Sequence, residues 1–130
     1  MKTVAEVMRS EFIVVAPEDT LGEVAQRLVE ESKGGAVLVK DFGRLVGILT
    51  ERDLARALAD GVDPMETAVK AYMTEEPVTV TLEADAAAVA ATMLDLGVRH
   101  LPVVDAGQVI GMVSSRDLLS LEAWNAIGVS

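Results

Sequence analysis

The chain has 130 residues and a formal net charge of −10 at pH 7. This excess of acidic side chains argues against nucleic acids and membrane surfaces as partners, because binding to anionic phosphate depends on cationic side chains. The sequence has no cysteine and one histidine, His100, which excludes disulfides and a multi-histidine metal site within one chain. The same counts lead us to expect no metal. No apolar run is long enough to span a bilayer and the N-terminus does not resemble a signal peptide, so we expect a cytoplasmic protein.

The first half of the chain predicts a helix, a strand, a helix, two strands and a helix. Thr3 and Glu6 have the spacing of a capping box, which predicts a short opening helix. Residues 12–15 look extended, and residues 21–29 carry apolar side chains at the spacing of an amphipathic helix. Two short β-branched runs, typical of buried strands, and a last helix follow: residues 36–39, residues 45–49 and the segment that opens at Thr50.

A stretch of turn-forming residues, 60–64, precedes a second half with the same order of elements. We expect its opening helix to start at Asp63 or Thr67, followed by an extended segment at 78–81. An amphipathic helix, two strands and a last helix then correspond to residues 86–94, residues 101–104, residues 109–113 and the segment that opens at Ser114.

The two halves are copies of one unit. A shift of 65 residues superposes them, and after one extra residue near positions 40–41 the shift becomes 64. The copies span about 4–59 and 69–123, which gives repeats at 1–62 and 63–130 of one intertwined module. Because half a chain is too small to bury a good core, we expect the repeats to pack face to face. The predicted fold class is α/β, with two small sheets covered by helices.

The most informative segment occurs twice, as G-h-h-[ST]-x-R-D-L at residues 47–54 and 111–118, where h is apolar. One interpretation is structural: the hydroxyl residue caps the following helix and the Asp suits the helix dipole. The other is functional: free N–H groups and the hydroxyl bind an anion, the Asp accepts ribose hydroxyls, and the Arg pairs with phosphate. The polar residues of the two copies are Thr50, Arg52 and Asp53, and Ser114, Arg116 and Asp117.

Two cationic candidates, Arg99 and His100, stand just before the apolar run 101–104. Either they are ordinary polar residues at the start of a strand, or they face a phosphate. The shift of 65 makes Gly34 and Gly35 their counterparts in the first half. That glycine pair forms either a turn or a place where a ligand approaches the backbone closely.

Together these features resemble a tandem pair of CBS domains, the Bateman module, in its small stand-alone bacterial form. The resemblance rests on the two copies of the motif, on the opening V-x-x-x-M, and on the run of residues 99–105. It implies a pseudo-twofold α/β module with two clefts between the repeats. It also implies a non-catalytic regulatory protein that binds AMP, ADP, ATP or S-adenosylmethionine and controls a partner protein.

The resemblance further implies two sites, each with residues from both repeats. The first comprises Thr50, Arg52, Asp53, Val80, Val98, Arg99 and His100. The second comprises Ser114, Arg116, Asp117, Val15, Lys33, Gly34 and Gly35. Since the first has more cations, we expect it to be the better phosphate binder. The first repeat has Val37 where the second has Pro102, and it lacks the Arg-His pair, which weakens the case for phosphate at the second site.

The leading hypothesis is therefore a sensor of an adenine nucleotide that forms a homodimer and acts on an unknown regulated protein. Candidates for the dimer surface, each of which could equally belong to the core, are Met8, Leu54, Leu58, Met73, Leu118, Leu121 and Trp124. The alternatives are a structural or protein-interaction module with vestigial pockets and an S-adenosylmethionine sensor. An enzyme is disfavoured, because no nucleophile and base occur at a recognisable spacing.

Overall fold

The computed structural model describes residues 2–31 and 34–119 and divides the chain into two compact units. Unit 2 is the continuous segment Phe12–Pro77, and unit 1 combines the chain before it with the chain from Val78 onward. The division into units therefore differs from the division into sequence repeats. The opening segment of each repeat packs in the unit that holds the other repeat's sheet.

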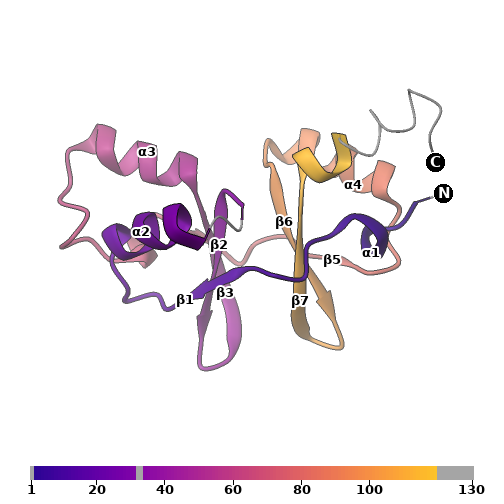
Figure 1. Cartoon of the computed structure of the whole chain (residues 1–130), viewed down its shortest axis with the longest axis horizontal. Coiled ribbons are helices and arrows are strands. Elements are labelled where there is room, and N and C mark those ends of the chain that lie inside the picture. Colours follow the sequence, from indigo (N-terminus) through magenta and orange to yellow (C-terminus); the bar gives the residue numbers. More distant parts are fainter. Residues whose placement is uncertain (1, 32–33, 120–130) are drawn as a thin grey trace. The chain divides into compact units, whose positions relative to one another are not determined.

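Unit 2 contains a four-stranded sheet in the order β1-β2-β3-β4, in which β1 and β2 are parallel and the other neighbours antiparallel. Helices α2 and α3 contact the strands and each other (Figure 1). The core lies between them and is rich in valine and leucine, with Leu21, Val24, Val37 and Leu49 fully buried. The elements are β1 Ile13–Val15, α2 Leu21–Glu31, β2 Ala36–Asp41, β3 Arg44–Thr50, α3 Glu51–Asp60, the 3-10 helix η1 Val69–Ala71 and β4 Thr74–Glu75.

Unit 1 contains a three-stranded sheet in the order β5-β6-β7, with β5 and β6 parallel and β6 and β7 antiparallel. The opening helix α1 packs against α4, and the apolar side chains of both contribute to a second core (Figure 1). The elements are α1 Val4–Val7, β5 Val80–Thr81, α4 Ala86–Leu96, β6 His100–Asp105 and β7 Gln108–Ser114, after which residues 115–119 are helical.

The predicted α/β architecture with two small sheets is confirmed, whereas the opening helix of the second repeat is wrong. Residues 64–66 form a turn, Ala68 makes an isolated β-bridge with Thr20, and only the short η1 follows. The backbone of this segment is bound to α2 instead: the N–H groups of Leu21 and Gly22 donate to the carbonyl oxygens of Thr67 and Pro64. Those carbonyl groups are consequently committed to tertiary contacts and not to a helix of their own.

The strand registers also correct the alignment of the two repeats. Ala36 pairs with Thr50 in unit 2, and His100 pairs with Ser114 in unit 1, so Ala36 is the counterpart of His100. The extra residue therefore lies before β2, not near positions 40–41. Gly35 becomes the counterpart of Arg99, and Leu38, not Val37, that of Pro102. Runs of similar apolar residues hide such a one-residue slip from a sequence comparison.

The duplicated glycine and methionine motifs meet in the structure. A Cβ atom on Gly111 would lie 2.7 Å from the carbonyl oxygen of Arg9 and 2.8 Å from the sulfur of Met8. In unit 2, Met73 packs in the same way on Gly47. The opening methionine of each repeat thus packs against the motif glycine of the other repeat, because glycine leaves room for a close approach.

Candidate functional site

The strand-to-helix junction of unit 2 is a complete capping box. Asp53 Oδ2 accepts hydrogen bonds from Thr50 N at 2.8 Å and from Thr50 Oγ1 at 3.1 Å. Thr50 Oγ1 in turn accepts from Asp53 N at 3.3 Å. Asp53 is the charged residue that the structure buries most fully among those described, with an exposed fraction of 7%. The extended backbone of Thr50 and the three-residue spacing place the two side chains together.

Unit 1 repeats this geometry with serine. Asp117 Oδ2 accepts from Ser114 N at 3.0 Å and from Ser114 Oγ at 2.9 Å, and Ser114 Oγ accepts from Asp117 N at 3.2 Å. The structural interpretation of the duplicated motif is therefore confirmed in both units.

Most of the N–H groups at the start of each helix, which could have bound an anion, already donate hydrogen bonds within the protein. In unit 2 the N–H groups of Thr50 and Asp53 are used by the capping box, and that of Glu51 donates to the carbonyl oxygen of Gly35 at 2.9 Å. In unit 1 the N–H of Ser115 donates to the carbonyl oxygen of Arg99, also at 2.9 Å. The hydroxyl protons are used as well. Binding of a phosphate would therefore depend mainly on cationic side chains, and the site built from helix-start N–H groups stays a prediction.

The second carboxylate oxygen of each aspartate is held by an arginine. Asp53 Oδ1 accepts from Arg56 Nη2 at 2.7 Å, and Asp117 Oδ1 accepts from Arg9 Nε at 3.4 Å. Neither arginine was a sequence candidate. Arg56 follows Asp53 by three residues on a helix, a spacing that could have identified it. Arg9 is 108 residues from Asp117 and gives no local signal.

The remaining predicted residues are spread over both units. Arg52, Arg99 and Arg116 are exposed, and Val80 and His100 are half-buried. Val15 is buried in the core of unit 2, which leaves only its backbone for a ligand. Val98 and Gly34 lie in the segments before β6 and β2, and Lys33 is outside the described residues. Each predicted set takes residues from both units, and the two sets stay predictions.

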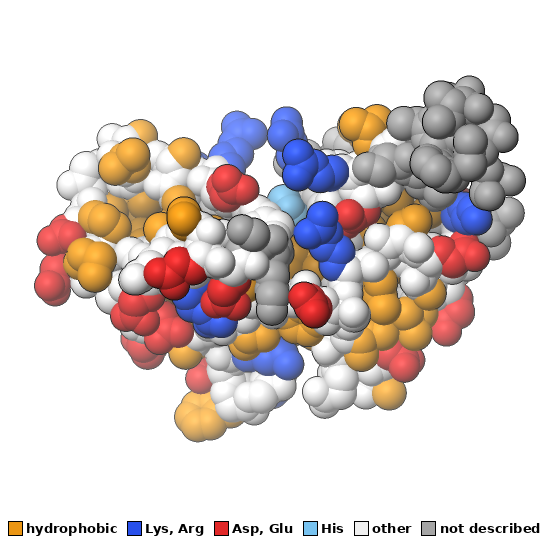
Figure 2. Space-filling view, in the orientation of Figure 1, with side chains coloured by type: hydrophobic (Ala, Val, Ile, Leu, Met, Phe, Trp, Pro, Cys, Tyr) orange, Lys and Arg blue, Asp and Glu red, His pale blue; other side chains and the backbone are white. Residues whose placement is uncertain are grey.

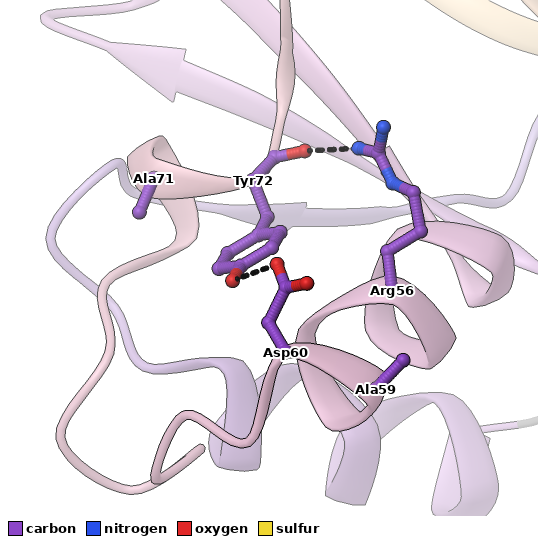
Figure 3. A pocket seen from close by; sticks show the side chains of 5 residues that line it. All are labelled: Arg56, Ala59, Asp60, Ala71 and Tyr72. Carbon is purple, nitrogen blue, oxygen red and sulfur yellow. Dashed lines mark hydrogen bonds between the residues drawn. The ribbon is translucent and has the colours of Figure 1, made fainter.

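A surface pocket of about 340 Å³ lies on unit 2 between α3 and the η1 region (Figure 3). Its lining residues are Arg56, Ala59, Asp60, Ala71 and Tyr72. Tyr72 donates from its hydroxyl to Asp60 Oδ2 at 2.7 Å, and Arg56 Nη2 donates to the Tyr72 carbonyl oxygen at 3.4 Å. The hydrogen bond to Asp60, and to a lesser degree desolvation and the Asp60 charge, raise the pKa of Tyr72. Arg56 thus connects the pocket to Asp53.

Several of the proposed dimer-surface residues belong to the cores. Leu118 is buried in the core of unit 1, so its assignment to a surface is wrong, whereas Leu54, Met8 and Met73 are half-buried and pack against the core clusters. Leu58 is 77% exposed. Figure 2 shows hydrophobic side chains at the surface over α2 and α3. Leu121 and Trp124 lie outside the described residues.

Residues 2–31 and 34–119 contain no cluster of three or more acidic, histidine or cysteine side chains suited to a metal ion. Within the same ranges no helix is both long and apolar enough to cross a membrane.

Comparison with known proteins identifies the family. The sequence profile described as CBS domain matches residues 4–60 and 69–123. The chain belongs to the CBS domain family. It contains a CBS pair, a regulatory ligand-binding module of a kind that is generally non-catalytic and binds adenosine-containing ligands.

Solved CBS structures share the fold over nearly the whole chain. A crystal structure of the CBS domain protein NE2398 is 34% identical, covers 94% of this chain and 98% of its own, and has a TM-score of 0.88. The CBS pair of protein MJ0100, in complex with 5′-methylthioadenosine and S-adenosylmethionine, is 26% identical with a TM-score of 0.87 and covers 96% of this chain and 98% of its own. An uncharacterised protein of Methanopyrus kandleri is 33% identical over 94% of this chain, which spans 63% of that relative's length.

Proposed function

We propose that this CBS pair senses an adenine nucleotide, AMP, ADP or ATP, and passes the signal to a regulated protein. The observation that carries the proposal is that the two oxygens of each motif carboxylate, in Asp53 and in Asp117, bind different partners. The cap uses one oxygen, Oδ2, whereas Oδ1 accepts a hydrogen bond from an arginine, Arg56 in unit 2 and Arg9 in unit 1. A carboxylate has about four acceptor positions, so Oδ1 can also accept a hydroxyl of ribose.

The arginines supply the contact for phosphate in this proposal. Arg52, Arg99 and Arg116 are exposed beside the two junctions, and their guanidinium groups are suited to bidentate contacts with phosphate. His100 follows Arg99 at the start of β6 and is half-buried. Because most helix-start N–H groups are taken by the caps, affinity for phosphate should depend on these side chains.

Two alternatives each have an observation in their favour. The structural neighbour crystallised with S-adenosylmethionine and 5′-methylthioadenosine favours a ligand without phosphate. The complete capping boxes favour a structural module with vestigial pockets, since capping alone accounts for both aspartates.

Calorimetric titration with AMP, ADP, ATP and S-adenosylmethionine separates these possibilities, with GMP as the control for the base. We expect at least one adenine nucleotide to bind and GMP to bind more weakly. Binding of S-adenosylmethionine alone would select that sensor. If no adenosine compound binds at millimolar concentration, the structural module is favoured and the proposal is contradicted.

We also propose that the chain forms a homodimer in which the exposed Leu58 contributes to the contact. Sedimentation of the wild type and of Leu58→Ser tests this. A dimeric wild type and a weakened dimer in the variant are expected, whereas a monomeric wild type contradicts it.

A further inference from the structure

The two strand-to-helix junctions share a backbone geometry but differ in charge at one equivalent position. Glu51 N donates to the Gly35 carbonyl oxygen, and Ser115 N donates to the Arg99 carbonyl oxygen, both at 2.9 Å. Together with the strand registers, these bonds make Gly35 the counterpart of Arg99 and Glu51 the counterpart of Ser115.

In unit 2 the Glu51 side chain occupies the space that a side chain on Gly35 would need. The atom nearest to a Cβ placed on Gly35 is the carboxylate oxygen Oε1 of Glu51, followed by Cδ and Cγ of the same residue. In unit 1 the long side chain belongs to Arg99, and its neighbour across the junction is the small Ser115. The large residue thus stands on opposite sides of the two junctions. It is the cation Arg99 in unit 1 and the anion Glu51 in unit 2.

The surrounding charges increase this contrast. Among the described residues, the unit 1 junction holds three arginines, Arg9, Arg99 and Arg116, beside one aspartate, Asp117. Counted in the same way, the unit 2 junction holds two arginines, Arg52 and Arg56, beside Glu51 and Asp53. In a chain with a net charge of −10, the first is a local excess of positive charge and the second is not.

We infer that Glu51 determines ligand charge: the Gly35 junction rejects the phosphate of an adenosine compound and accepts an uncharged or cationic 5′ group, whereas the Arg99 junction accepts phosphate. The inference rests on the proposed function and assigns a different ligand class to each junction. It groups Arg99 with Asp117, to whose junction Ser115 N binds it, and not with Asp53 as in the set expected from the resemblance. It therefore leaves Arg99 and Arg116, and not Arg52, as the contacts for phosphate. Its physical basis is that a carboxylate within a few ångströms repels a phosphate, while a neutral adenosine is indifferent to it.

The decisive comparison is calorimetric titration of AMP and of adenosine into the wild type and Glu51→Gln, at low salt. Glutamine keeps the shape of the side chain and removes its charge. We expect the weaker of the two AMP affinities to rise about threefold to tenfold in the variant, with adenosine unchanged. The gain should shrink in high salt, because screening weakens the repulsion.

Two further variants make the test specific. Glu66→Gln removes one negative charge from an exposed position of unit 2 outside the junction, and it should leave both titrations unchanged. Ser115→Glu introduces a carboxylate at the counterpart of Glu51, and it should weaken AMP but not adenosine.

Each result decides the inference. Equal changes for AMP and adenosine in Glu51→Gln, or the same gain in Glu66→Gln, would overturn it while leaving the proposed function intact. If neither compound binds to any of the proteins, the proposed function fails and the inference fails with it.

Discussion

At the residue scale, capping a helix and holding a ligand are compatible uses of the same aspartate. Asp53 and Asp117 each close a capping box with Oδ2 and hold an arginine with Oδ1. The sequence presented these uses as alternatives because it did not show which oxygen each partner takes. In the structure the cap uses Oδ2 and the arginine binds Oδ1. The contribution of each aspartate to folding stability and its proposed role in binding can therefore be tested independently.

Asp53→Ala should destabilise unit 2. The change removes the acceptor for Thr50 N and leaves Arg56 without its carboxylate, and loss of a cap of this kind costs about 1–2 kcal/mol. Asp53→Asn should cost less, because its amide oxygen still accepts from Thr50 N. Urea unfolding followed by circular dichroism measures both. A loss in Asp53→Asn as large as in Asp53→Ala would show that the capping bond is not the main contribution.

Tyr72 should lose its proton at a higher pH than a free tyrosine. Its hydroxyl donates to Asp60, and this bond, with desolvation and the Asp60 charge, raises its pKa above the ordinary value of about 10. A raised pKa means that the bond stabilises the fold below pH 10 and that this stabilisation is lost as pH rises through the folded-state value. The chain has one tyrosine, so phenolate absorbance reports on this group alone.

Asp60→Asn supplies the comparison for this titration. It removes the carboxylate charge, and the midpoint should fall toward 10. Asp95→Asn, in α4 of unit 1, serves as the control and should leave the midpoint unchanged. A wild-type midpoint at or below 10 would contradict the hydrogen bond between Tyr72 and Asp60.

At the element scale, each sheet holds the opening segment of the other repeat through a glycine. Arg9 pairs with Met112 next to Gly111, and β4 pairs with β3 at Gly47. The motif glycine and the opening methionine, which looked unrelated in the sequence, are two sides of one contact. This contact explains why a short segment with little structure of its own is attached to each sheet.

Gly111→Ala should therefore be costly, and more so than Gly47→Ala. The new methyl group on Gly111 would meet a backbone oxygen, that of Arg9, at 2.7 Å. On Gly47 the nearest atom is the flexible Met73 sulfur, and the nearest backbone oxygen is 3.1 Å away. Overpacking of this kind costs about 1–3 kcal/mol, and we expect the two variants near the opposite ends of that range. Thermal unfolding checks the order, and the reverse order would contradict the packing described.

Element prediction succeeded where the pattern was local. The apolar spacing of residues 21–29 and 86–94 predicted α2 and α4, and the β-branched runs predicted the two hairpins. It failed for residues 63–75, where the turns, η1 and β4 are determined by bonds to α2 and β3. Such tertiary contacts have no periodicity that a sequence could reveal.

At the scale of the whole molecule, the duplication was visible in the sequence. The sequence did not show that the opening segment of each repeat packs in the unit of the other repeat. The repeats divide the chain once, whereas packing assigns the segments before Phe12 and after Pro77 to the same unit. For the candidate site, the motif residues were found because they occur twice. Arg9 was missed because its partner is distant in sequence, and Glu51 was passed over because its importance depends on which residue lies opposite it.

The claim that the motif aspartates hold ribose is tested most directly by a calorimetric comparison of AMP with its 2′,3′-dideoxy analogue. The wild type, Asp53→Asn and Asp117→Asn are each titrated with both compounds. Removing hydroxyls that bind a carboxylate should weaken binding to the wild type about tenfold or more, and the preference should disappear at the site of each substitution. Equal binding of the two compounds by the wild type, or a preference kept at the substituted site in both variants, would contradict this account.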